Sequence, residues 1–320
     1  MRVAVCSAPI PSLDAAQAGA VIARAWAALG AQVALIPLTE HSPEMLDLMA
    51  DYDPDAACWA GPTIASAPEF GQTSSESVGR ALLTGLTGLC DARRIYADLT
   101  GAAACDDGGR GFAASMGTDA VAELRSLLAG RELIALVAPD EVGAPLVGLR
   151  GLASVRGRDR GLDLSTILEA DQRIAAVGQR WGIDPEEPGA GAVGGVGRAL
   201  LAAGATLVSP LDALIQASGL PDTIGRADLV VVGCEQLDFG AMGGPVVTEV
   251  VQLSANKLRP VVVVAGTNHV SNRELRTVGI EAAHAVRERH FEHAGETDES
   301  PISADELSAV AHRVAGSWHW

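Results

Sequence analysis

The sequence predicts an α/β protein in which both ends of the chain build one doubly wound parallel sheet, while the middle forms an inserted second α/β domain. Short runs of β-branched residues recur near both ends, as is typical of strands that are buried on both faces. Helical segments separate these runs, and the middle of the chain is rich in glycine turns. We expect residues 1–57 and 205–320 to form the first domain and residues 58–204 to form the second.

The first βαβ unit follows from the pattern of the N-terminal residues. Residues 3–6 form a short apolar strand, and residues 15–29 carry apolar side chains at helical spacing up to Gly30, which stops the helix. Residues 32–37 then form a second strand. Two parallel strands joined by a helix are expected to have a right-handed crossover.

The end of the chain repeats this alternation. Residues 227–233 (ADLVVVG) and 260–265 (PVVVVA) are continuous apolar strands, and residues 245–255 between them are helical. Together with the first unit, they predict a flavodoxin/Rossmann-like sheet. Residues 290–301 are polar and acidic and predict a linker, which precedes a final helix over residues 303–315.

The charge composition excludes several classes of function. The 320-residue chain has 40 acidic and 23 basic side chains, a formal charge of −17, and 48% hydrophobic residues. A sizeable core is therefore available, whereas binding to nucleic acid or to an anionic membrane needs basic surface. Lys257 is the only lysine, which excludes mechanisms that need several lysines.

The N-terminus and the cysteines predict a cytoplasmic protein. Residues 1–10 show no basic segment followed by a long apolar stretch, so no signal peptide is expected. The five cysteines are odd in number, widely spread and without CxxC spacing, which disfavours a disulfide framework and a cysteine-based zinc site. Assembly into a homo-oligomer is left open.

A glycine string in the middle of the chain is the first candidate binding feature. Gly189, Gly191 and Gly194 match G-x-G-x-x-G, and Gly195 follows. A dinucleotide fingerprint follows a strand, whereas residues 181–188 are a polar, proline-bearing loop, so NAD binding is disfavoured. A glycine loop that opens a helix can still attract phosphate through free N–H groups. The rival explanation is that these glycines only permit close helix packing.

The run Asp106, Asp107, Gly108 and Gly109 is the second feature. Adjacent carboxylates on a turn point in different directions, so we expect at most one to face a given ligand. Asp107 could hold Mg²⁺ directly or through water, because Mg²⁺ prefers hard oxygen ligands. An ordinary Asp-Gly turn is the rival explanation.

Four arginines within eleven residues are the third feature: Arg150, Arg156, Arg158 and Arg160. Local positive charge in a strongly acidic chain would draw in and clamp phosphate or carboxylate. A solvated loop that pairs with the chain's many carboxylates explains the same cluster equally well.

The fourth feature is an acidic segment after the apolar run 227–233. Glu235 and Asp238 lie where ligands bind in open α/β sheets, beyond the carboxyl end of a strand. An aspartate there could accept or orient the proton of a substrate hydroxyl. An acidic loop or a helix cap is the alternative.

Several segments, in order, resemble the type II, two-domain glycerate kinases. Residues 101–109 (GAAACDDGG) are similar to the family's GGSATNDGG, and residues 188–197 (PGAGAVGGVG) are similar to PGAGAAGGLG. Residues 145–161 resemble PL-x-G-x-x-GA-x-x-(F)GPQKG, and residues 227–238 (ADLVVVGCEQLD) resemble ADLVITGEGRID. The resemblance covers most of the chain, from about residue 3 to residue 286.

The resemblance implies ATP-dependent phosphorylation of D-glycerate or a similar small hydroxy acid, with Mg²⁺, on a flavodoxin-like domain plus an inserted domain. Phosphoryl transfer depends mostly on positioning and on neutralising charge. The implied catalytic residues are Asp238, on the last aspartate of GEGRID, and Arg160, at the lysine of GPQKG. The implied metal ligand is Asp107, and the implied nucleotide- and phosphate-binding residues are Gly108, Gly109, Gly189, Gly191, Gly194 and Gly195. Arg150, from the arginine group, is a further candidate for phosphate binding.

This sequence also departs from the family pattern at the expected site. An early lysine of the family falls on Ile10, the asparagine of DVTNP falls on Ala144, and the arginine of GEGRID falls on Gln236. Two interpretations stay open. The chain is a divergent kinase in which arginines replace lysines, or it is a catalytically degenerate member that acts as a ligand-binding or regulatory protein.

Overall fold

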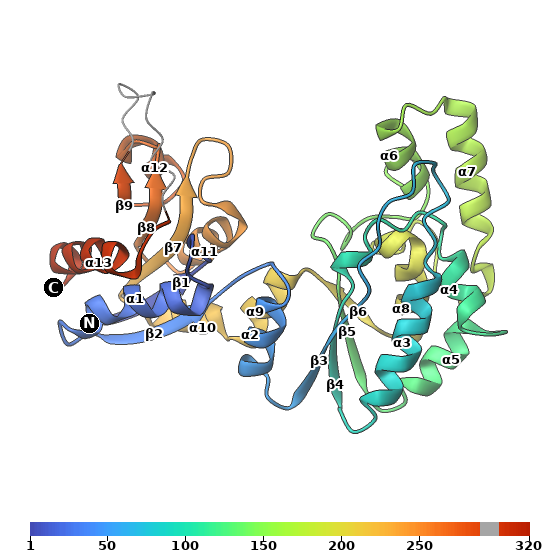
Figure 1. Cartoon of the computed structure of the whole chain (residues 1–320), viewed down its shortest axis with the longest axis horizontal. Coiled ribbons are helices and arrows are strands. Elements are labelled where there is room, and N and C mark those ends of the chain that lie inside the picture. Colours follow the sequence, from blue (N-terminus) through green and yellow to red (C-terminus); the bar gives the residue numbers. More distant parts are fainter. Residues whose placement is uncertain (289–300) are drawn as a thin grey trace. The chain divides into compact units, whose positions relative to one another are not determined.

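The computed structural model describes residues 1–288 and 301–320, which form two compact units (Figure 1). One unit consists of Met1–Leu48 and Leu214–Trp320, and the other consists of Met49–Ala213. The chain crosses between the units within helices α2 (Glu44–Tyr52) and α9 (Pro210–Ala217). The predicted linker, residues 290–301, lies almost entirely outside the described residues.

The first unit contains a five-stranded parallel sheet with strand order β2-β1-β7-β8-β9. The chain moves outward from β1 to β2 and later returns to the other side of β1 with β7, which confirms a doubly wound sheet built from both chain ends. The direction of winding therefore reverses between β1 and β7. The strands are β1 (Arg2–Ser7), β2 (Gln32–Pro37), β7 (Leu229–Leu237), β8 (Val261–Asn268) and β9 (Ala282–Glu288).

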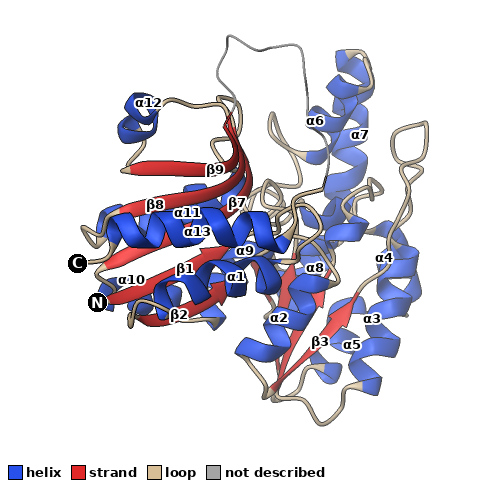
Figure 2. Cartoon of the chain, turned by 60° about the vertical axis from the view of Figure 1, so that its left-hand side comes forward, coloured by secondary structure: helices blue, strands red, loops and turns tan. Residues whose placement is uncertain are grey.

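Helices cover both faces of this sheet (Figure 2). Helix α1 (Ala15–Ala27) and helix α13 (Ala304–Trp318) pack together on one face, against a core that includes the fully buried Trp26. Helix α10 (Leu220–Arg226) and helix α11 (Gly244–Asn256) lie on the other face, and helix α12 (Asn272–Thr277) precedes β9.

A capping box begins helix α1. The side chain of Asp14 accepts a hydrogen bond from the N–H of Gln17 at 2.7 Å, and the side chain of Gln17 accepts one from the N–H of Asp14 at 3.4 Å. The predicted helix over residues 15–29 is therefore confirmed, although it ends two residues earlier, at Ala27.

Strand β7 is longer than the sequence predicts. The expected end at residue 233 is wrong, because the strand continues to Leu237. Cys234, Gln236 and Leu237 pair with Ala265, Thr267 and Asn268 of β8, and this pairing keeps the acidic segment extended. Asp238 is consequently the first residue after the strand.

The second unit contains a four-stranded parallel sheet in chain order: β3 (Ala56–Ala60), β4 (Arg94–Asp98), β5 (Glu132–Leu136) and β6 (Thr206–Val208). Helices α3 (Glu76–Gly88), α4 (Arg110–Ser115), α5 (Ala120–Leu127) and α8 (Val196–Ala203) pack with one another beside this sheet. Helices α6 (Leu152–Asp159) and α7 (Leu164–Ala176) form a separate pair with a small apolar cluster of its own.

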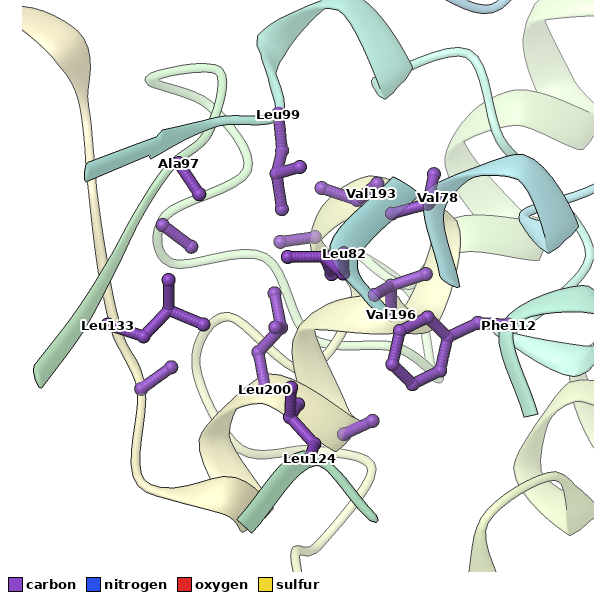
Figure 3. Packing of buried hydrophobic residues seen from close by; sticks show 14 of the residues in the cluster. Val78, Leu82, Ala97, Leu99, Phe112, Leu124, Leu133, Val193, Val196 and Leu200 are labelled. Carbon is purple, nitrogen blue, oxygen red and sulfur yellow. The ribbon is translucent and has the colours of Figure 1, made fainter. Parts of the chain in front are cut away.

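The main core of the second unit joins residues from the sheet and from its helices (Figure 3). Leu82, Phe112 and Leu200 come from α3, α4 and α8, and none of these side chains is exposed. Burial of such side chains contributes roughly 1.5–3 kcal/mol each through the hydrophobic effect. Among the described residues of the whole chain, no helix is long and apolar enough to cross a membrane.

We expect Leu82→Ala to destabilise the second unit by about 2–5 kcal/mol, because it removes buried methyl groups and leaves a cavity in this core. Leu168→Ala on α7 is the control, since that side chain is 54% exposed and its truncation should cost less than about 1 kcal/mol. Scanning calorimetry measures both. Equal effects of the two substitutions would contradict this account of the core.

Candidate functional site

A cavity of about 420 Å³ lies at the carboxyl end of the first sheet, where the direction of winding reverses. Ligands of open α/β sheets bind at such switch points because the loops diverge there. Its walls come from three places: the segment after β1, the segment after β2, and the end of β7 together with the turn that leads to α11. The principal polar residues among them are Thr39, Glu40, His41, Glu235, Gln236 and Asp238.

Asp238 is held in one orientation at this cavity. Its Oδ1 accepts hydrogen bonds from the N–H groups of Gly240 and Ala241 at 2.8 and 2.7 Å. Its Oδ2 accepts one from Nε2 of Gln236 at 3.1 Å. The carboxylate therefore caps the turn that follows β7 and is also half-exposed beside the cavity.

The turn between β7 and α11 is shaped by three consecutive residues with positive φ: Met242 at 46°, Gly243 at 91° and Gly244 at 83°. Such angles favour glycine, so Met242 is the residue with a steric cost. The turn places the start of α11 at the cavity wall. Next to it, burial raises the pKa of the Cys234 thiol to about 12, so this residue stays neutral where the family motif has a glutamate.

In the second unit, the predicted site residues lie on loops at the carboxyl end of its sheet. Because β3, β4 and β5 are parallel, the segments 61–75, 99–109 and 137–151 that follow them lie at the same edge. Backbone hydrogen bonds connect these segments: the N–H of Leu99 donates to the carbonyl of Leu136 at 2.8 Å, and that of Asp106 donates to Thr73 at 3.0 Å.

Asp107 accepts four hydrogen bonds. Its Oδ1 receives the hydroxyl of Ser75 and the N–H of Gly109 at 2.8 and 3.0 Å. Its Oδ2 receives the N–H groups of Ser75 and Gly111 at 3.0 and 2.8 Å. These donors fill the lone-pair positions of a carboxylate, so the residue joins α3 to α4 structurally. The Mg²⁺ role of Asp107 stays a prediction, and a directly bound ion would compete with these bonds.

Asp106 is completely buried and pairs with Arg160. Oδ1 of Asp106 accepts the N–H of Thr73 at 2.8 Å, and Oδ2 lies 3.2 Å from Nη2 of Arg160 without a hydrogen-bonded donor of its own. The same guanidinium donates to the hydroxyl of Ser66 at 3.1 Å and lies 5.7 Å from the centre of the Phe70 ring. Arg160 therefore ties the segment 61–75 to the turn at Asp106.

Glu141 is a buried acid beside Arg156. Its Oε1 lies 3.6 Å from Nη2 of Arg156, and its Oε2 accepts the N–H of Val193 at 3.3 Å. Burial raises the pKa of Glu141 to about 7, although the Val193 N–H and Arg156 act in the opposite direction. Arg156 also donates to the carbonyls of Ala103 and Ala104. Both halves of this ion pair thus hold loops at the carboxyl edge.

Glu141 was missed as a site residue from the sequence. The signal was present: once the asparagine of DVTNP is placed on Ala144, Glu141 falls on the aspartate of the same motif. Burial and the nearby guanidinium distinguish this acid from its exposed neighbour Asp140, and neither property is visible in the sequence.

The four glycines of the string 189–195 are buried and pack against backbone. The N–H groups of Gly189 and Gly191 both donate to the carbonyl of Ala144, at 3.1 and 2.9 Å. A Cβ on Gly191 would overlap the carbonyl of Pro145, and one on Gly194 would overlap the carbonyl of Cys105. One on Gly195 would lie 2.6 Å from the carbonyl carbon of Gly108. Close packing therefore accounts for these glycines, and their phosphate-binding role stays a prediction.

The remaining predicted residues differ in their surroundings. Gly108 and Gly109 have positive φ, at 69° and 79°, and form the turn that wraps around Asp107. Arg150 is exposed and has no ion-pair partner among the described residues. Arg158 donates to the carbonyls of Ser154 and Leu149.

The predicted site residues belong to both units. Asp238 is part of the first unit, whereas Arg160, Asp107, Arg150 and the six glycines are part of the second. Within residues 1–288 and 301–320, no group of three or more His, Cys, Asp or Glu side chains is placed to hold a metal ion.

The sequence profile of the glycerate kinase family matches residues 131–319. The chain belongs to the glycerate kinase family. This membership confirms the resemblance drawn from the motifs, and low identity to curated relatives fits a divergent member.

Three relatives show how low the sequence identity is. An uncharacterized protein of Mycobacterium bovis is 32% identical over 254 residues, which cover 75% of this chain and 62% of that protein. Glycerate 2-kinase of Escherichia coli is 30% identical over 152 residues, covering 46% and 40% of the two chains. Glycerate kinase of Halalkalibacterium halodurans is 29% identical over 188 residues, covering 56% and 48%. The chain thus spans at most about three fifths of the length of these relatives.

The fold is also shared with a solved structure of the family. A protein of Salmonella typhimurium LT2 assigned as glycerate kinase 2 has a TM-score of 0.70 to this chain at 19% identity. The likeness covers 99% of this chain and 98% of the other. At this identity it shows the fold alone.

We expect Gly194→Ala to destabilise the second unit by more than about 2 kcal/mol, because the methyl group would overlap the Cys105 carbonyl and φ is 63°. Gly204→Ala is the matched control. Its φ is 91° but its Cβ would meet open space, so only the backbone cost of about 1–2 kcal/mol applies. Urea unfolding compares the two, and a smaller loss at Gly194 would contradict the packing explanation.

The raised pKa of Glu141 predicts a pH dependence of stability. Because the folded-state pKa of about 7 exceeds the ordinary value of 4.5, its contribution to stability is complete below pH 4.5 and is lost as the pH rises through 7. The loss amounts to about 3 kcal/mol at most. Glu141→Gln should therefore raise the melting temperature relative to wild type more at pH 8 than at pH 5. The exposed Glu123→Gln on α5 should not, and a pH-independent difference for Glu141→Gln would contradict the assignment.

Proposed function

We propose that this chain is an ATP-dependent kinase that phosphorylates a hydroxyl group of D-glycerate or of a similar small hydroxy acid. The observation that carries the proposal is the cavity at the switch point of the first sheet, with Asp238 oriented beside it, in a chain of the glycerate kinase family. A cavity of about 420 Å³ falls within the range of small-molecule sites. ATP would supply the phosphoryl group, and Mg²⁺ would neutralise its developing charge.

Asp238 is the proposed residue that accepts or orients the proton of the substrate hydroxyl. Hydrogen bonds from Gly240, Ala241 and Gln236 fix its position, which favours general-base work because the carboxylate needs no reorganisation. Glu235 is exposed and lies on the same cavity, where a carboxylate oxygen is available to a hydrated Mg²⁺ ion.

Arg160 has a supporting role in this proposal. Its guanidinium is engaged by Asp106 and Ser66, so its main effect is to hold the segment 61–75 at the carboxyl edge of the second sheet. Arg150 differs because its exposed guanidinium is not engaged by a described acid, which favours it as a contact for phosphate. The glycine turns and Asp107 shape the same edge.

The proposed setting is the cytoplasm, with a small hydroxy acid as partner and neither nucleic acid nor membrane. The acidic balance of the chain supports this view, since both excluded partners are polyanionic.

A coupled assay of ADP release tests the proposal with purified protein, Mg²⁺, ATP and D-glycerate, while product analysis follows phosphoglycerate. We expect glycerate-dependent turnover in the wild type and a loss of about 10²–10⁴-fold in Asp238→Asn, because the amide cannot accept the proton. Asp222→Asn on α10 is the control, since this exposed aspartate lies in the same unit but outside the cavity.

Two results would contradict the proposal. Turnover that persists in Asp238→Asn would show that Asp238 is not the general base. Stabilisation by ATP or by small acids in a thermal-shift screen, without turnover for any hydroxy acid, would favour a catalytically degenerate binding protein.

A further inference from the structure

A second cavity lies entirely within the inserted unit, beside the turn at Asp106 and Asp107. Its volume is about 90 Å³, roughly the share of three water molecules in the liquid. The cavity therefore matches one small group rather than a whole nucleotide. Phe70, Arg110, Arg173 and Ile174 provide its apolar and cationic walls.

Helix α7 presents one face to this cavity. Ala170, Arg173 and Ile174 all line it, and their spacing of three and four residues is that of one side of a helix. Val177, the first residue after the helix, also lines it. Ala170 and Ile174 are buried in the small cluster between α6 and α7, which fixes the face. Nε of Arg173 donates to the carbonyl of Glu169 at 3.3 Å, and this hydrogen bond restricts the orientation of the side chain.

Arg110 lines the same cavity from a second element, helix α4. It is the first residue of α4 and directly follows Gly109, whose φ of 79° sets the direction of the chain there. The turn before it is rigid because Asp107 binds the N–H groups of Gly109 and Gly111 on either side. Two arginines from separate elements thus line one small cavity.

The described carboxylates around the cavity form no ion pair with these two arginines. Both are exposed, and no other described carboxylate forms an ion pair with either of them. The two acids in the wall are already engaged, since Asp106 pairs with Arg160 and Asp107 accepts four hydrogen bonds. In a chain of formal charge −17, two unpaired guanidinium groups on one cavity form an unusual local site for negative charge.

We propose that this cavity is an oxyanion-binding site, in which Arg110 and Arg173 bind the phosphate or carboxylate group of a small molecule. Guanidinium groups suit both oxyanions because their N–H donors match pairs of oxygen atoms. Phe70 and Ile174 give the adjoining wall an apolar character, which suits a group that continues into a short carbon chain. The residues that line this site all belong to the inserted unit and differ from those that line the cavity of the first unit. Anion binding here is measurable without kinase turnover.

Isothermal titration calorimetry tests this with inorganic phosphate in one arm and acetate in the other, at constant ionic strength set with chloride. We expect saturable 1:1 binding in the wild type that weakens at least tenfold in both Arg110→Gln and Arg173→Gln. Arg180→Gln is the control, because this exposed arginine lies outside the cavity and its variant should bind as the wild type does. The anion that binds more tightly identifies the group for which the site is built.

The three arginines are exposed, so the variants should keep the wild-type melting temperature. Absence of saturable binding of either anion to the wild type would overturn the proposal. Binding that survives unchanged in both cavity variants would also overturn it, because the anion would then lie elsewhere. Since the readout is binding alone, its failure is distinguishable from a failure of the kinase assay.

Discussion

The close approach of two backbone segments organises the inserted unit. Gly194 and Gly195 lie against the segment Cys105–Gly108 so tightly that a Cβ at either glycine would meet the opposite backbone. This contact brings the start of α8 next to the turn that carries Asp106 and Asp107. The N–H groups on that turn are then free to bind Asp107, which in turn fixes α3 and α4 through Ser75 and Gly111. Glycine is needed here because only a residue without a side chain allows the two backbones to approach so closely.

Burial of acids is the second constraint on this unit. Asp106, Asp107 and Glu141 are nearly inaccessible in a chain that already carries excess negative charge. A buried carboxylate is costly unless hydrogen bonds or a cation stabilise it. Arg160 and Arg156 meet this need for Asp106 and Glu141, and backbone donors meet it for Asp107. The arginine cluster therefore has a structural task as well as any contact with ligand.

The α/β class and most elements of the first unit could be predicted, because hydrophobic periodicity is a local property of the chain. Strands β1 and β2 and helices α1, α11 and α13 lie where the pattern places them, and β8 begins there but continues to Asn268, three residues past its expected end. The end of β7 was mispredicted because Glu235 and Gln236 are polar. Their strand conformation comes from pairing with β8, which is a contact between distant residues. Local hydrophobicity carries no information about such pairing.

The sequence by itself determined the family, the parallel sheets and the segments in which chemistry could reside, because these follow from local patterns and ordered motifs. The tertiary structure decided what each residue in those segments does. It engaged Asp107 with four donors, paired Arg160 with a buried acid and raised the pKa of Glu141 to about 7. It also left Arg110 and Arg173 together on one cavity. Burial and ion pairing depend on residues far apart along the chain. Only the folded structure therefore distinguishes a charged side chain with a structural role from one that is available to a ligand.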